Sequence, residues 1–387
     1  MKTNIKRSTI HTHEGATASH INAEQQLRRS VMACMLWEDE FYESGESIAK
    51  RVADTIALVD PAKVADIAIE ARSKMKLRHV PLLIAREMAR LPKHKGLVSG
   101  LLPQIIQRAD ELTEFLSIYW KDGRQKVSAQ VKKGLAAAFP RFDEYNLAKY
   151  NRDGAVKLRD VLFLSHAKPK DDVQAVVWKR LVNGELATPD TWEVALSSGA
   201  DKKEAFTRLM AEKKLLALAF IRNLRNMQQA GIAKEAVAAY AQEIDISRVL
   251  PFRFITAARF VPQWEDVLEP MMMRVLASQE KLAGHTVLLV DVSGSMDKKL
   301  SSKSDATRMD AGFGLGVLLR EICASVNIYT FSNALAIVPA RHGFALRDAM
   351  KNSQEHGGTY LEGALTTLHA HENYERIIVI TAAQTHD

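Results

Sequence analysis

Residues 286–295 have the sequence TVLLVDVSGS, and this stretch predicts the fold of the C-terminal part of the chain. Its first five residues are apolar or β-branched, which is typical of a buried strand. Asp291, Ser293 and Ser295 follow at alternating positions and place three oxygens on one loop. Loops at the carboxyl edge of an α/β sheet present ligands in this way, and hard divalent cations prefer oxygen ligands. The stretch therefore predicts an α/β sheet with a candidate cation site.

Strands and helices alternate on both sides of this loop. Besides 286–290, strands are predicted at 326–331, 334–338 and 376–380, and helices at 306–324, 344–352 and 359–371. This alternation predicts a doubly wound, parallel-type sheet with helices on both faces. Gly312, Gly314 and Gly316 lie inside a helical pattern with no strand directly before them. They indicate close packing of the helix on the sheet rather than a dinucleotide-binding loop.

The chain before residue 284 consists instead of short amphipathic helical segments. Ala23–Phe41, Glu46–Val59 and Pro61–Met75 carry apolar residues at helical spacing, and Asp60 is a candidate N-cap before Pro61. Further segments are predicted at 79–91, 96–109, 111–120 and 128–139. A helical pair recurs at roughly 35 to 40 residues, within the range of HEAT-like repeats. On periodicity alone, an irregular helical bundle is the alternative.

The composition is that of a soluble globular protein. The chain has 387 residues, 47% hydrophobic and 26% charged, which suits two or three domains. There is no run of about 18 apolar residues that would span a membrane, and the N-terminus lacks the apolar core of a signal peptide. Cys34 and Cys323 are expected to be buried free thiols in a reducing cytoplasm. Residues 1–20 are polar and small and predict a mobile arm.

The net charge of +7 is unevenly distributed. Residues 1–284 hold 44 Lys and Arg against 35 Asp and Glu, whereas residues 285–387 hold 9 against 11. A basic helical part suggests a polyanionic partner, most simply nucleic acid. A solvated lysine-rich surface would explain the same excess.

Two separated motifs resemble the metal-ion-dependent adhesion site of von Willebrand factor A domains. One is the Asp-x-Ser-x-Ser sequence at 291–295, and the other is Gly-Gly-Thr at 357–359, which opens a later helix. The resemblance implies a divalent cation, usually magnesium, with four ligands from this chain: Asp291, Ser293, Ser295 and Thr359. Members of the family place an Asp directly after a strand like 377–381, where this chain has Ala382. With a single carboxylate, a hard cation is expected to bind more weakly.

Four segments of the helical part resemble the TROVE module of the Ro autoantigen and bacterial Rsr family, which also occurs in telomerase-associated and vault proteins. They are LRHVPL at 77–82, RDVLFLSHAKP at 159–169, TWE at 191–193 and LRNM at 224–227. A TROVE module followed by an A-like domain is the order found in that family. The resemblance implies an arm at 1–20, a TROVE domain of HEAT-like repeats at 21–283 and an A-like domain at 284–387. Because the A domain of the family continues with further strands, this one is expected to be incomplete after Asp387.

The family resemblance also implies a function. Ro-like proteins form a monomeric ring of helices closed by the A domain, bind small noncoding Y RNA on its outer face, and take single-stranded 3′ ends of misfolded RNA into its hole. In bacteria the Y RNA can link the protein to polynucleotide phosphorylase, so a role in RNA quality control is expected. The motif match assigns Lys149 and His166 to Y RNA contact. The alternatives are an ordinary solvated lysine for Lys149 and a helix-capping or core-edge histidine for His166.

Four more basic residues are candidate RNA contacts within the ring: Arg78, His79, Arg222 and Arg225. Burial in the ring, with their heads on carbonyl groups, is an equal alternative for them.

Catalysis is not expected, because there is no nucleophile elbow, no Gly-Lys-Ser phosphate loop and no general base beside Asp291. An RNA-binding ribonucleoprotein component without enzymatic activity is therefore the favoured function. The alternatives are an adhesion scaffold that captures a partner's carboxylate through the cation and, more weakly, a metal-dependent hydrolase.

Overall fold

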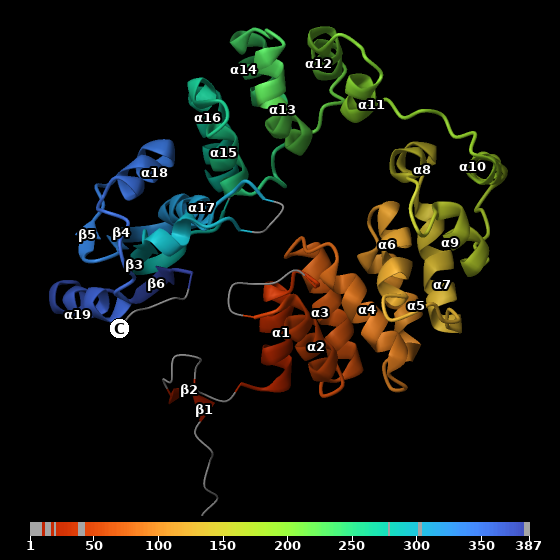
Figure 1. The fold of residues 1–387 in the computed structure, drawn as a ribbon, viewed down its shortest axis with the longest axis horizontal. Helices are drawn as coiled ribbons and strands as arrows, with labels where there is room; N and C mark the ends of the chain where they lie inside the picture. The colour runs from red at the N-terminus through yellow and green to blue at the C-terminus, as the bar shows by residue number, and fades with distance from the viewer. Residues whose placement is uncertain are drawn as a thin grey trace, which may run out of the picture. The chain divides into compact units, whose positions relative to one another are not determined.

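The computed structural model describes residues 10–11, 17–18, 21–37, 43–277, 279–300 and 304–382. They belong to two compact units, Met1–Pro189 and Asp190–Asp387, each of which is described by itself (Figure 1). The predicted arm at 1–20 lies outside the described residues, apart from the antiparallel pair β1 (Ile10–His11) and β2 (Thr17–Ala18). Within the described part of the chain, no helix is long and apolar enough to cross a membrane.

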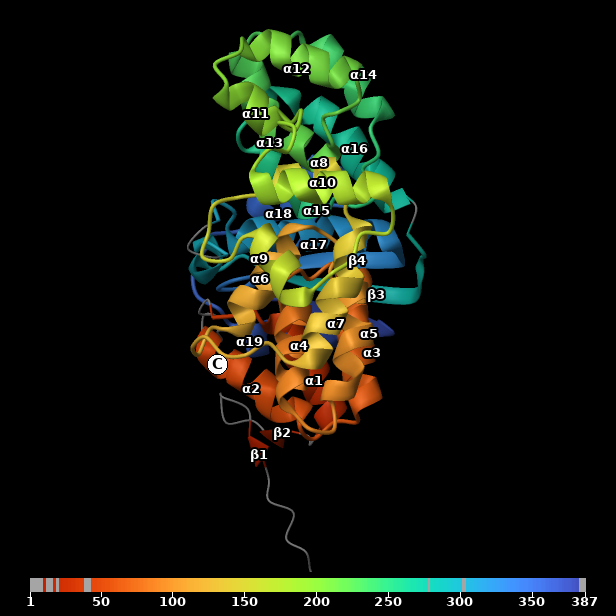
Figure 2. The same cartoon turned by 90° about the vertical axis from the view of Figure 1, so that its right-hand side faces the viewer.

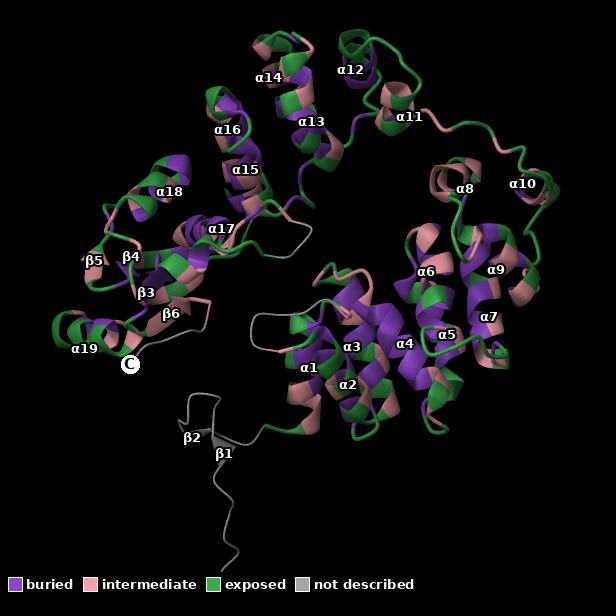
Figure 3. Ribbon diagram, viewed as in Figure 1, coloured by how far each residue is buried: buried purple, intermediate pink, exposed green. Residues whose placement is uncertain are grey.

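The first unit is helical, as predicted, and its helices lie side by side in Figures 1 and 2. They are α1 (Ala23–Ala33), α2 (Gly45–Ile56), α3 (Pro61–Ser73), α4 (Val80–Arg90), α5 (Val98–Ile105), α6 (Asp110–Tyr119), α7 (Ala129–Ala138), α8 (Glu144–Tyr150), α9 (Leu158–Ser165) and α10 (Asp172–Asn183). Their apolar stripes face one another and form one continuous core, which appears as buried residues between the helices in Figure 3. The core explains why amphipathic spacing predicted these elements well.

Local signals set the helix ends. Asp60 caps α3 as predicted, because its Oδ1 accepts hydrogen bonds from the backbone N–H groups of Ala62 and Lys63. The predicted extension of the first helix to Phe41 is wrong, since α1 ends at Ala33. Leu36 adopts a left-handed conformation with φ of 59°, which a continuing α-helix cannot contain.

A buried charge network joins α3, α5 and α6. The Glu111 side chain is fully buried, and its Oε1 lies 2.8 Å from Arg72 Nη2. Arg72 Nε donates to the carbonyl of Ile105 at 3.0 Å, near the end of α5. Glu111 Oε2 accepts from the backbone N–H groups of Gln107 and Arg108, at 2.7 and 3.1 Å. One carboxylate therefore satisfies a buried guanidinium and the turn that leads into α6.

The second unit begins with more helices and continues into a sheet. The helices before the sheet are α11 (Trp192–Ser197), α12 (Lys202–Ala211), α13 (Ala217–Gln229), α14 (Lys234–Glu243), α15 (Pro251–Ala258) and α16 (Glu265–Ala277). The change from helix to strand falls between Ala277 and Leu282, close to the predicted position near 284, although the compact units divide at Pro189. The prediction that 21–283 forms one domain stays a prediction.

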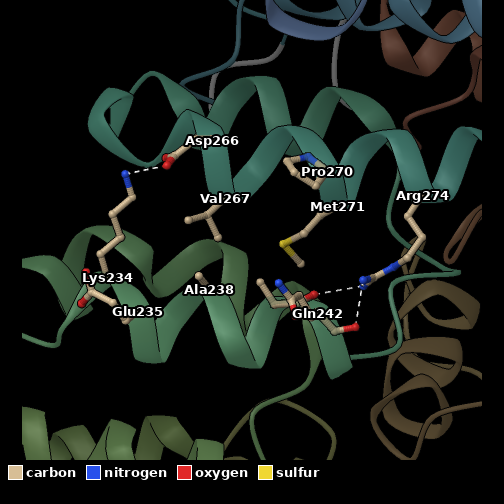
Figure 4. A pocket seen from close by; sticks show the side chains of 10 residues that line it. Lys234, Glu235, Ala238, Gln242, Asp266, Val267, Pro270, Met271 and Arg274 are labelled. Carbon is tan, nitrogen blue, oxygen red and sulfur yellow. Dashed lines mark hydrogen bonds and ion pairs between the residues drawn. The ribbon is translucent and has the colours of Figure 1, made fainter.

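A cavity of about 370 Å³ lies between α14 and α16, and polar contacts frame it at both ends (Figure 4). Lys234 Nζ pairs with Asp266 at 2.7 Å at one end. At the other end the Arg274 guanidinium donates to the carbonyls of Ala241, Gln242 and Ile244. Because the last carbonyls of a helix lack partners within the helix, Arg274 acts as the C-terminal cap of α14.

The sheet has four strands in the order β5-β4-β3-β6. Its strands are β3 (Leu282–Asp291), β4 (Cys323–Phe331), β5 (Leu335–Ile337) and β6 (Arg376–Ile380). β4 and β6 run parallel to β3, as predicted, but the edge strand β5 runs antiparallel to β4, so the sheet is mixed. The short connection after Phe331 allows only this direction, because a parallel strand needs a crossover of a dozen or more residues.

Helices cover both faces of the sheet, as predicted. Leu288 and Val290 belong to the core shared with α15, α16, α17 (Arg308–Ile322) and α18 (Gly343–Lys351). Val287 and Leu289 point to the opposite face, where α19 (Leu361–His371) covers them. The two cysteines are buried free thiols, which also agrees with the prediction.

The three glycines of α17 mark close packing, as predicted. A Cβ on Gly312 would lie 3.1 Å from Met296 Cε, and one on Gly316 would lie 2.9 Å from Met350 Sδ. At Gly314 the obstacle is the backbone of α15, since a Cβ would lie 2.9 Å from Phe252 Cβ and 3.0 Å from its Cα. The small glycines therefore allow α17 to pack closely on α15, and α17 also packs on one face of the sheet.

Gly314→Ala should therefore lower the free energy of unfolding by about 1–3 kcal/mol. The added methyl group meets backbone atoms, which cannot move aside as a flexible side chain can. Denaturant unfolding followed by circular dichroism would measure the loss. Gly363→Ala in α19 is the matched control, because a Cβ there meets nothing within 4 Å. This control should be neutral or stabilising by up to about 1 kcal/mol, and equal losses in both variants would contradict the packing argument.

Candidate functional site

The predicted cation loop is assembled at the carboxyl end of β3. Asp291 is fully buried, and its Oδ1 accepts a hydrogen bond from the backbone N–H of Ser293 at 2.8 Å. Ser293 Oγ lies 2.9 Å from Ser295 Oγ. Thr381, the residue after β6, donates from its Oγ1 to Asp291 Oδ2 at 2.7 Å. The parallel pairing of β3 with β6 places these two strand ends next to each other.

The loop that carries Thr359 lies against the Asp291 loop. The backbone N–H of Gly294 donates to the carbonyl of Gly357 at 3.0 Å. Ser332 and Asn333, just beyond β4, hold this second loop by accepting from the backbone N–H groups of Gly357 and Gly358. Thr359 itself is only 2% exposed. The structure thus brings together the two motifs that lie more than sixty residues apart in the sequence.

The donor set of this site consists of oxygens with a single carboxylate. Among the residues that the structure describes, no group of three or more His, Cys, Asp or Glu could hold a metal ion. Ala382, which follows Thr381, is half-buried and offers no ligand. Hydroxyl and carboxylate oxygens suit a hard cation such as Mg²⁺, but one negative charge favours weak binding.

Lys149 and His166 both lie in the first unit. Lys149 is on α8, where its Nζ lies 5.7 Å from the ring centroid of Tyr145 and 5.8 Å from that of Tyr150. No carboxylate pairs with it within the described ranges of the chain. His166 ends α9 in a left-handed conformation, with φ of 56° and ψ of 36°, and it is exposed. His166 therefore ends α9, as the alternative of a helix-capping histidine predicted, and it remains exposed to solvent.

Arg78 and His79 both lie against acidic side chains. Arg78 pairs with Asp110 at 2.5 Å and with Glu114, and its Nε lies 3.6 Å from Glu111 Oε1. His79 Nε2 lies 3.3 Å from Glu114 Oε2. Burial would raise the pKa of Glu114, but the hydrogen bond from His79 and the charge of Arg78 outweigh it and hold that pKa below its usual range. The Arg78 guanidinium and the His79 ring are thus directed at carboxylates and not at backbone carbonyls.

Arg222 and Arg225 lie on α13 in the second unit, and both are exposed. The guanidinium carbon of Arg225 lies 5.2 Å from the ring centroid of Phe260. Both arginines line a cleft of about 650 Å³ together with Arg253 of α15. Within the described residues, neither forms an ion pair, in contrast to Arg78.

Comparisons with known proteins agree with this architecture. A family model of the TROVE domain matches residues 179–311. The crystal structure of the Deinococcus radiodurans RO (RSR) protein is similar to this chain, with a TM-score of 0.65 and 18% sequence identity over 94% of this chain and 87% of that one. Residues 179–311 of the chain are therefore similar to a TROVE domain, and its fold resembles that of the RO (RSR) protein. No curated protein matches it.

The TROVE match covers only some of the candidate residues. The matched residues 179–311 include Arg222, Arg225 and the Asp291 loop, whereas Arg78, His79, Lys149, His166 and Thr359 lie outside it. The likeness to the RO (RSR) structure shows the shared fold, a helical part followed by a small α/β part.

Two features of the candidate sites were not predicted from the sequence. Thr381 is a partner of Asp291, and its position directly after a strand that pairs with β3 is the signal that could have shown it. Arg253 joins Arg222 and Arg225 in one cleft, but it lies on a different helix, and no local pattern in the sequence links them.

Proposed function

We propose that this protein binds RNA and acts as a ribonucleoprotein component. The observation that carries the proposal is the TROVE match together with basic side chains that have no carboxylate partner among the described residues, of which Lys149 is the clearest. Phosphate contacts by such side chains supply salt-dependent affinity. Arg78 and His79 are left out of the proposed interface, because both side chains already contact carboxylates within the fold.

The surface around Lys149 suits a small noncoding Y-like RNA. Lys149 would neutralise a phosphate, and Tyr145, whose exposed fraction is 45%, would offer a ring on which an unpaired base can stack. His166 is exposed and would donate to a phosphate or stack on a base. Phe163, three residues before it, is 58% exposed and adds a second apolar surface on α9.

We further propose that the helical repeats and the A-like domain form a monomeric ring in the cytoplasm, with the single-stranded 3′ ends of misfolded RNA entering its hole. Arg222 and Arg225 would contact those ends. The expected role is RNA quality control without catalytic activity of its own, with the Y-like RNA recruiting an exoribonuclease such as polynucleotide phosphorylase. A hole selects unpaired strands over duplexes by width, and a basic lining holds them through phosphate contacts.

The cation loop supports a second, compatible proposal. Asp291, Ser293, Ser295 and Thr359 would hold a divalent cation, most simply Mg²⁺, which could then accept a carboxylate from a protein partner. The clustering of these residues at one sheet edge favours this adhesion role. Protein capture that is lost in EDTA while RNA binding persists would establish it as a separate activity.

The double substitution Lys149→Ala with His166→Asn should weaken binding of a Y-like RNA by roughly tenfold or more, because a phosphate contact and a stacking or donor contact are both lost. Asn is chosen because it tolerates the left-handed backbone at this position. Filter binding at several salt concentrations would measure both affinity and salt dependence, and the slope of log K against log salt should fall by about 1.

Lys133→Ala on α7 is the matched control. Lys133 is exposed, and its substitution removes one positive charge from the same unit. It should change affinity far less than the double substitution. Equal affinity of the double variant and the unchanged protein, or a flat salt dependence in both, would count against the proposed RNA interface.

A further inference from the structure

The cleft between α13 and α15 gathers positive charge from three arginines. Arg222 and Arg225 enter it from α13, Arg253 enters it from α15, and residues 304–306 close another side. Within the described residues, none of these three arginines pairs with a carboxylate. Arg259, which directly follows α15, is different, because it pairs with Asp310 and donates to the carbonyl of Asp305.

The electrostatics of the cleft favour a multivalent anion. Partial burial lowers the pKa of Arg253, and the like charge of Arg222 lowers it further, so the two guanidinium groups are close enough to repel each other. Asp305 is the acidic residue among those that line the cleft, and its carboxylate is 3.7 Å from Lys299 Nζ. Three guanidinium charges against one shared carboxylate leave about two positive charges for a ligand.

One wall of the cleft also presents an aromatic ring. Phe260 is 41% exposed, and the Arg225 guanidinium lies over its ring. Leu218, Ile221 and Ala257 add apolar surface beside it. A ring with a guanidinium beside it forms a stacking platform for a nucleobase, since every base has a π-face and arginine adds a cation–π contribution.

We propose that this cleft binds a nucleotide through its phosphomonoester group, with the phosphate between Arg222 and Arg253 and the base stacked on Phe260. A phosphomonoester carries about −1.5 to −2 charges at neutral pH, which matches the uncompensated charge better than the single charge of an internal phosphodiester. The ligand is either a free nucleoside monophosphate or the phosphorylated end of an RNA strand, and the second source rests on the proposed RNA binding. At about 650 Å³ the cleft lies within the volume range of ligand sites.

Isothermal titration of the full chain would test this site with AMP, adenosine and a short single-stranded RNA whose ends carry either phosphate or hydroxyl groups. AMP should bind and adenosine should not. If the RNA end is the source, the phosphorylated strand should bind roughly tenfold or more tightly than the hydroxyl strand. If the source is the free nucleotide, AMP should bind more tightly than adenosine, while the two strands should bind equally. Equal affinities of AMP and adenosine, together with equal affinities of the two strands, would overturn the proposal.

Matched variants locate the effect. Arg222→Gln and Arg253→Gln should each remove the preference for phosphate, and Phe260→Leu should weaken AMP while leaving inorganic phosphate unchanged. Arg248→Gln, which removes the same charge from an exposed position outside the cleft, should preserve the preference. If it abolishes the preference as well, the site is not this cleft.

The outcome is separable from that of the proposed function. If the unchanged protein binds Y-like RNA but shows no preference for phosphate, only the cleft proposal is rejected. If it binds AMP but no RNA, only the RNA interface is rejected.

Discussion

Glu111→Ala is expected to lower the free energy of unfolding by about 3–5 kcal/mol, the usual range when one partner of a buried ion pair is removed. Glu111 is fully buried, and the side chain of its partner Arg72 is 10% exposed. Without the carboxylate, the Arg72 guanidinium keeps the hydrogen bond to Ile105 but loses its counter-charge. The backbone N–H groups of Gln107 and Arg108 also lose their acceptor. Unsatisfied buried groups cost more than a well-made hydrogen bond gains.

Denaturant unfolding would measure the total loss, and amide hydrogen exchange in α3, α5 and α6 would locate it in the first unit. Asp54→Ala is the control, because the Lys50–Asp54 pair is 75% and 62% exposed. Such a pair contributes at most about 0.5 kcal/mol. If the two variants lost the same stability, the buried network would not be a main support of these helices.

Ala382→Asp is expected to raise the affinity for Mg²⁺ on the order of 100-fold, because it would add a second carboxylate to a site that has one. Thr381 already donates to Asp291, so the residue that follows it lies beside the loop. Ala382 is half-buried, and a new carboxylate there without a cation would be repelled by Asp291. Cation binding and stability should therefore be coupled in this variant, with Mg²⁺ raising its melting temperature.

Titration calorimetry with MgCl₂ would measure the affinity. Ala382→Asn is the control of matched shape, and it should gain little because it adds no charge. Asp291→Asn should abolish cation binding in both the unchanged protein and the Ala382→Asp variant. A gain in affinity with Asn equal to that with Asp would show that charge is not what the site lacks.

Much of the fold could be predicted from local patterns. The apolar run before Asp291 is the buried strand β3, Asp60 is the cap of α3, and the three glycines of α17 are close-packing positions. Each of these depends on interactions within a few residues or on a period that the element itself imposes. That the Asp291 loop and the Gly-Gly-Thr motif meet was implied by their resemblance to the metal-ion-dependent adhesion site.

The state of the basic residues could not be predicted in this way. Arg78 and Arg222 look alike in the sequence, yet Arg78 pairs with carboxylates more than thirty residues away, whereas Arg222 shares a cleft with other arginines. The antiparallel direction of β5 and the hydrogen bond from Thr381 also depend on neighbours in space.

The amino-acid sequence alone thus determined the elements, the family resemblance and the cation motif, because these follow from short-range pattern and spacing. Only the tertiary structure decided which charges are neutralised and which remain free to bind an anion, because electrostatic energy depends on distance in space and on burial. The sequence 286–295 therefore predicted the α/β sheet and its candidate cation loop, while the packing of α13 on α15 decided where we place a new site.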